Sequence, residues 1–92
     1  AFADIDGDGL LDLYLAAYVA YRKGTQDLCR LGAQESACGP EQYEPERGRL
    51  YRQAAPGRFQ DITGAAGLSG TAGKTWGAAF ADYDRDGRPD LY

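Results

Sequence analysis

The chain has 92 residues, and it shows neither a signal-peptide pattern nor an apolar run long enough to span a membrane. Because it begins without Met, directly on a charged motif, we expect it to be a piece of a longer protein. The net charge is −4, but eight of the 14 acidic residues lie in two stretches, 4–12 and 82–90, against ten basic residues in the whole chain. Such local acidity is typical of cation sites, and the apolar and aromatic content excludes a disordered acidic tail.

Both acidic stretches belong to an internal repeat. Residues 1–14 (AFADIDGDGLLDLY) and 79–92 (AFADYDRDGRPDLY) are identical at ten of 14 positions, at an offset of 78 residues. Repetition of this kind indicates a modular architecture. We therefore predict that residues 1–92 form a partial β-propeller, with one full repeat and the start of the next.

Turn residues and runs of Leu, Tyr, Val and Phe predict four strands per repeat. They cover residues 11–19, 50–52, 58–63 and 75–83, with a hairpin turn at 55–57. We expect a Gly-rich connection over residues 64–73, with one helical turn at Ala65 and Ala66.

Residues 22–48 do not fit this strand pattern. They hold both cysteines and two of the four prolines, and we interpret them as a Cys-containing loop insertion within the blade. Without the insertion the repeat has the size of a four-stranded propeller blade, roughly 50 residues. The predicted fold class is all-β, with four-stranded antiparallel propeller blades; a β-solenoid is the alternative.

Both acidic stretches follow the pattern D-x-D-x-D-G-x-x-D, which suits Ca²⁺. Calcium takes six to eight oxygen ligands, and alternate carboxylates in a tight Gly-containing loop can converge on one ion. The seventh residue, Leu10 or Arg88, would offer its backbone carbonyl. The predicted ligands are Asp4, Asp6, Asp8, Leu10 and Asp12 in the first loop and Asp82, Asp84, Asp86, Arg88 and Asp90 in the second. The alternative is a pair of solvated acidic turns without an ion.

An EF-hand does not fit these loops. That motif needs Glu at position twelve, where the first copy has Leu15, and helices on both sides, where the flanks here are strand-like. Position eight of the second copy is Pro89, which has no N–H to donate.

The pattern F-A-D-x-D-x-D-G-x-x-D-L-Y resembles the FG-GAP/VCBS repeats of integrin-α-like β-propellers. More closely, the chain is similar to the propellers of cartilage acidic protein and its bacterial relatives, the ASPIC/UnbV-associated proteins. The motifs that carry this resemblance follow in order as CGP at 38–40, RLYR at 49–52, GRFQDIT at 57–63, AG at 66–67 and WGAAFAD at 76–82. A departure is QAAP at 53–56, where relatives carry an Asn-rich Asp-Gly turn. The resemblance implies that the loops bind Ca²⁺ and hold the blades in shape.

The two cysteines are nine positions apart in the insertion. A zinc site normally needs four ligands and a catalytic Cys needs a base such as His, but the chain has no His and no third Cys. We predict a local disulfide between Cys29 and Cys38, with two reduced thiols as the alternative. A disulfide would indicate an oxidising compartment, so the predicted location is extracellular, cell surface or periplasmic.

The residues favour binding over catalysis. With the clustered carboxylates assigned to metal and no His present, we expect no enzyme, but a non-enzymatic extracellular binding, adhesion or scaffold module. Its expected partners are a protein or carbohydrate ligand and further blades of the full-length chain, with no nucleic acid and no membrane insertion. Two alternatives stay open: a segment of a calcium-dependent propeller enzyme acting on polysaccharide, and a purely structural repeat. Trp76 and the tyrosines could stack on sugars, but filling gaps between blades is the simpler role.

Overall fold

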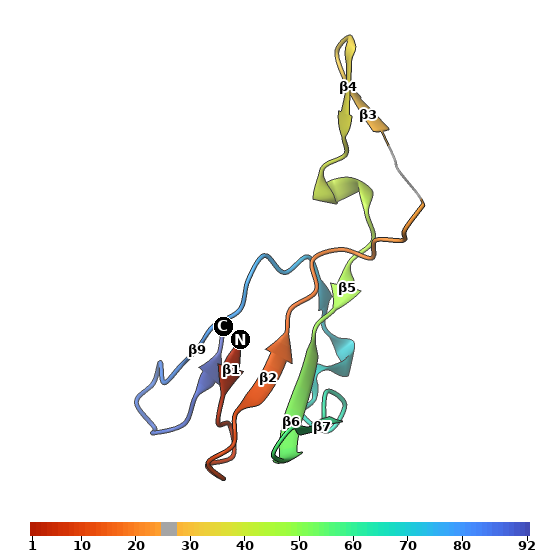
Figure 1. Cartoon of the computed structure of the whole chain (residues 1–92). Helices are drawn as coiled ribbons and strands as arrows, with labels where there is room; N and C mark the ends of the chain where they lie inside the picture. The colour runs from red at the N-terminus through yellow and green to blue at the C-terminus, as the bar shows by residue number, and fades with distance from the viewer. Residues whose placement is uncertain (25–27) are drawn as a thin grey trace.

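The computed structural model describes residues 1–24 and 28–92, and its centre is a four-stranded antiparallel sheet (Figure 1). The order of the strands is β1 (Phe2–Ala3), β2 (Asp12–Leu15), β6 (Arg49–Ala55) and β7 (Arg58–Asp61). Leu13 of β2 lies opposite Phe2 on one side and Tyr51 on the other. This register places the residues that follow Tyr51 alongside the loop that precedes β2.

The four strands of the sheet differ in part from those predicted. The strand expected at 50–52 extends over Arg49–Ala55, with a register shift between Gln53 and Ala55 next to the predicted hairpin turn. The strand expected at 11–19 ends at Leu15. After Leu15 the chain leaves the sheet, and Ala17 and Ala20 instead hydrogen-bond with Thr75 and Glu44.

The prediction that residues 75–83 form a strand of the first blade is wrong. Only Phe80–Ala81 (β9) is a strand, and it pairs with Asp90–Leu91 (β10) in a separate two-stranded sheet. The fourth place in the blade is taken by β1, which comes before the first acidic loop. The pair β9–β10 thus repeats the pair β1–β2, because the two segments have nearly the same sequence.

The insertion at 22–48 contains regular structure that the sequence analysis did not predict. β3 (Leu28–Leu31) and β4 (Gln34–Ala37) form a hairpin that projects away from the main sheet (Figure 1). A single 3₁₀ turn, η1 (Pro40–Gln42), follows, and β5 (Glu46–Arg47) pairs with β8 (Ala72–Gly73). Residues 25–27 of the predicted insertion lie outside the described residues.

The Gly-rich connection is nearly as expected. Ala66 donates to the carbonyl of Ile62, and a 3₁₀ turn, η2 (Leu68–Gly70), follows two residues later than the predicted helical turn. Within residues 1–24 and 28–92, no helix combines the length and apolar character that crossing a bilayer requires.

Very few side chains are buried among the described residues. Leu50 is the buried apolar residue of the described part, and its N–H donates to the Thr63 hydroxyl at 2.9 Å. Large side chains stay exposed, among them Trp76 at 84%, Tyr83 at 86% and Tyr92 at 98%. Such exposed apolar and aromatic surface is typical of a sheet that is covered by neighbouring structural units.

Candidate metal centres in two acidic loops

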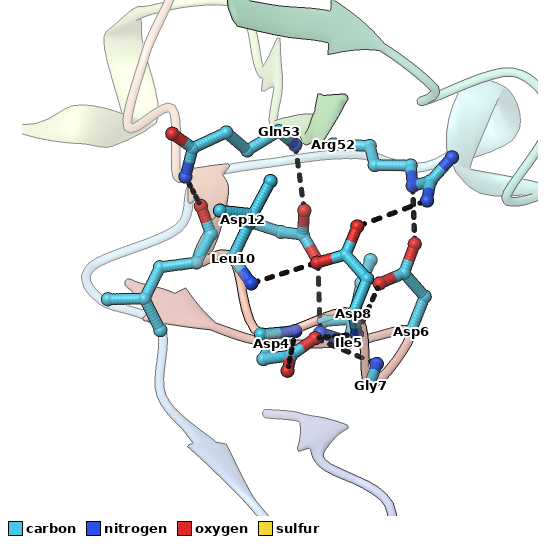
Figure 2. Close-up of polar contacts among 11 residues, drawn as sticks. Asp4, Ile5, Asp6, Gly7, Asp8, Leu10, Asp12, Arg52 and Gln53 are labelled. Carbon is cyan, nitrogen blue, oxygen red and sulfur yellow. Dashed lines mark hydrogen bonds and ion pairs between the residues drawn. The ribbon is translucent and has the colours of Figure 1, made fainter. Parts of the chain in front are cut away.

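The first acidic loop joins β1 to β2 and folds around the carboxylate of Asp4 (Figure 2). One oxygen of Asp4 accepts the N–H groups of Gly7 at 2.7 Å and Asp8 at 3.1 Å, and the other accepts that of Gly9 at 2.8 Å. These bonds, with that from Gly9 the strongest influence, hold the pKa of Asp4 below its usual value. The loop therefore keeps its first carboxylate ionised, as a metal ligand must be.

Asp12 anchors the end of this loop from inside the protein. It is fully buried, and its two oxygens accept the backbone N–H groups of Ile5 at 2.9 Å and Gln53 at 2.8 Å. The side chain of Gln53 also donates to the carbonyl oxygen of Leu11 at 2.7 Å. Asp12 thus connects the loop, β2 and the third strand of the sheet.

The second acidic loop, between β9 and β10, shares part of this hydrogen-bond pattern. Four of the hydrogen bonds recur at positions 78 residues apart. In the first loop, the backbone N–H groups of Asp8, Gly9, Leu10 and Ile5 donate to the carboxylates of Asp6, Asp4, Asp8 and Asp12, in that order. In the second loop, the N–H groups of Asp86, Gly87, Arg88 and Tyr83 donate to the carboxylates of Asp84, Asp82, Asp86 and Asp90, in the same order. The sequence repeat is therefore also a repeat of conformation.

Left-handed backbone positions recur in the same way. Gly7 and Gly9 have φ of 77° and 86°, and the equivalent Arg85 and Gly87 have φ of 64° and 87°. Gly adopts this region without a steric penalty, whereas Arg85 does so at a cost. The conformation is thus kept in the second loop even where the side chain opposes it.

Three carboxylates converge in each loop. One oxygen from each of Asp4, Asp6 and Asp8 lies within 4.8 Å of the others, and the same holds for Asp82, Asp84 and Asp90. Two ligands of one calcium ion, each at about 2.3–2.6 Å from it, lie no more than about 5 Å apart. The oxygen-only donor set and this spacing both fit calcium.

The other predicted ligands are placed differently. Asp12 and Asp86 lie outside the two groups of three, and the N–H groups of Leu10 and Arg88 donate to the fifth-position carboxylates Asp8 and Asp86. The two loops are neighbours, because residues 4–7 and 87–89 line one open cavity of about 350 Å³.

Two residues at the first loop were missed by the sequence analysis. Arg52 pairs with Asp6 and, at 3.2 Å, with Asp8, while Gln53 holds Asp12 as described above (Figure 2). Both are on β6, more than 40 residues further along the chain. The antiparallel pairing of β2 with β6 brings them to the loop, and the sequence carries no local signal for that register.

The family of FG-GAP-like repeats matches residues 23–92, which include the second acidic loop. The chain belongs to the FG-GAP-like repeat family. Comparison with curated proteins and with solved structures found no significant match. FG-GAP-like repeats form blades of β-propellers, so the predicted all-β propeller fold is confirmed and the four-stranded sheet is a blade. Family membership also implies further blades, which would cover the aromatic surface that this chain leaves exposed.

The predicted disulfide is confirmed as well. Cys29 on β3 is bonded to Cys38, directly after β4, with the two Cα atoms 4.9 Å apart. The bond closes the base of the projecting hairpin. Structural disulfides persist in oxidising compartments, so this bond indicates a location outside the cytoplasm.

Proposed function

We propose that this FG-GAP-like segment binds calcium in its two acidic loops and acts as a non-enzymatic extracellular binding or scaffold module. The observation that carries the proposal is the agreement between the loops. Two segments 78 residues apart share four internal hydrogen bonds, and each gathers three carboxylates within 4.8 Å. Carboxylates this close repel one another, and a bound divalent cation would relieve that repulsion.

The chain supplies a specific set of ligands for each ion. The two groups of three carboxylates form the centre of each site, and the backbone carbonyls of Leu10 and Arg88 with the carboxylates of Asp12 and Asp86 complete the proposed sets. Calcium bound there would tie the end of one strand to the start of the next. Its role is therefore structural, since it stabilises the edge of a blade.

The disulfide-closed hairpin β3–β4 is the proposed contact with a protein or carbohydrate partner. It projects from the blade (Figure 1), and Leu28 and Leu31 are 62% and 73% exposed at its surface. Binding residues commonly lie on such excursions from a rigid scaffold. We also propose that the chain is more closely related to the propellers of cartilage acidic protein. The motifs at 38–40, 49–52 and 57–63 support this relationship.

The test is calcium titration of the full-length propeller by calorimetry, with melting curves in calcium and in chelator. Asp6→Asn and Asp84→Asn should each remove about one bound ion and lower the melting temperature in calcium, because each deletes one charge from a carboxylate cluster. Glu35→Gln, the same chemical change on the projecting hairpin, is the control and should have no effect. Loss of stability that is equal in calcium and in chelator would contradict calcium binding by these loops.

A further inference from the structure

The guanidinium group of Arg52, on β6, contacts the carboxylates of the first acidic loop. Its Nε donates to Oδ2 of Asp6, and its Nη2 donates to Oδ2 of Asp8 at 3.2 Å (Figure 2). Asp6 and Asp8 are two of the three carboxylates that converge in this loop. Arg52 therefore bridges the same pair of side chains that a calcium ion would use.

The remaining oxygens of these two carboxylates are already engaged. Oδ1 of Asp6 accepts the N–H of Asp8 at 3.2 Å, and Oδ1 of Asp8 accepts the N–H of Leu10 at 2.8 Å. These backbone bonds maintain the fold of the loop. The oxygens that the backbone leaves open are the two that Arg52 holds.

The second loop provides an internal comparison. Its equivalent backbone bonds run to Oδ1 of Asp84 and Oδ1 of Asp86, as in the first loop. Among the described residues, Arg52 forms ion pairs with two carboxylates of the first loop, and no basic side chain is paired in this way with the carboxylates of the second loop. The two loops thus share these two backbone hydrogen bonds, but only the first loop has the guanidinium group of Arg52 beside its carboxylates.

We propose that Arg52 is a built-in counter-ion that competes with calcium for Asp6 and Asp8. This inference rests on the proposed function and concerns the regulation of the same site. Without metal, Arg52 neutralises the two carboxylates and keeps the first loop folded. Calcium must displace the guanidinium from both Oδ2 atoms, because a monovalent cation and a divalent cation repel each other at such short range. The first loop therefore has a metal-free folded state, at the cost of calcium affinity.

The experiment compares Arg52→Gln with wild type in the full-length protein, by calcium calorimetry and by melting in chelator. One site should bind calcium about tenfold more tightly in Arg52→Gln, since one positive charge near the ion is removed. The same variant should melt at a lower temperature in chelator, because Asp6 and Asp8 then repel each other without a counter-ion. Arg30→Gln is the control: it makes the same charge change on β3, far from the loop (Figure 1), and should alter neither property.

A second background assigns the effect to the first loop. In an Asp6→Asn/Asp8→Asn protein, Arg52→Gln should leave calcium binding by the other sites unchanged. If Arg52→Gln does not fold, Arg52→Lys is the second variant. It keeps the positive charge but loses the planar guanidinium group that bridges two carboxylates, so it should still bind calcium more tightly than wild type.

The outcomes separate the two proposals. Calcium affinity that is unchanged or weaker in the Arg52 variants, in a protein that binds calcium, would overturn the competition alone. A wild-type protein whose loops bind no calcium would overturn the proposed function and the competition with it.

Discussion

The carboxylate of Asp12 accepts the backbone N–H of Gln53 at 2.8 Å, which joins the end of the first acidic loop to a strand 41 residues later. Its second oxygen accepts the N–H of Ile5 inside the loop. Because Asp12 is fully buried, neither N–H can turn to water if the carboxylate is lost. This one side chain therefore couples the conformation of the loop to the pairing of β2 with β6.

Replacement of Asp12 should destabilise the blade with or without calcium. Asp12→Asn presents an NH₂ group to one of the two donors, and the free energy of unfolding should fall by about 2–3 kcal/mol. Urea denaturation in calcium and in chelator measures this loss. Asp84→Asn is the comparison, since its loss should be confined to calcium; an Asp12 effect that disappears in chelator would contradict the role of the hydrogen bonds.

Gly48 should not tolerate a larger residue. It is buried before β6, and a Cβ at this position would overlap the phenol ring of Tyr14 on β2. Gly48→Ala should therefore cost about 1–3 kcal/mol in the free energy of unfolding. Gly77→Ala is the control, because a Cβ there meets no atom within 4 Å; equal stabilities of the two variants would contradict this packing.

The left-handed Arg85 should be a site of strain in the second loop. Arg85→Gly removes both the charge and the unfavourable conformation, whereas Arg85→Ala removes the charge and keeps the conformation. The Gly variant should be the more stable of the two by about 1 kcal/mol. Thermal unfolding in chelator measures the difference, and a more stable Ala variant would show that residue 85 does not adopt this conformation in solution.

Acid should weaken the blade partly through Asp61. The hydroxyl of Thr63 donates to Asp61 at 2.6 Å and its N–H at 2.9 Å, and these bonds, with Arg49 nearby, lower the pKa of Asp61 below 3.8. A carboxyl group whose pKa is lower in the folded state stabilises the protein above its unfolded-state pKa, and this stabilisation is lost as the pH falls through the folded-state pKa. Asp61→Asn should thus lower the melting temperature at neutral pH, and the difference from wild type should shrink as the pH falls below 3.8. A difference that is constant with pH would mean that ionisation of Asp61 contributes nothing.

The disulfide should stabilise the hairpin alone. Closing a loop of this size contributes roughly 2–3 kcal/mol in the chain-entropy model. Because the hairpin projects from the sheet (Figure 1), Cys29→Ser/Cys38→Ser should speed amide exchange across β3 and β4 and leave the melting temperature of the propeller unchanged. Wild type treated with reductant should behave like the double variant. A lower melting temperature of the whole protein would show that the hairpin packs on the blade.

Local patterns in the sequence were sufficient for the fold class, the repeat and the disulfide. The two copies of the repeated motif, the hairpin turn at 55–57 and the isolated pair of cysteines are each recognised within a short stretch of sequence. The spacing of the aspartates also predicted two equivalent loops, since alternate residues of a tight Gly-containing turn converge whatever surrounds them.

Pairing between distant segments was decided only by the tertiary structure. It placed β1 in the blade in place of residues 75–83, formed a hairpin within the insertion, and brought Arg52 and Gln53 to the first loop. Antiparallel register depends on how well two strands bury and hydrogen-bond together, and no single segment carries that information. For the same reason two loops with the same acidic motif differ in their surroundings: Arg52, which lies on a strand outside the motif, pairs with carboxylates of the first loop.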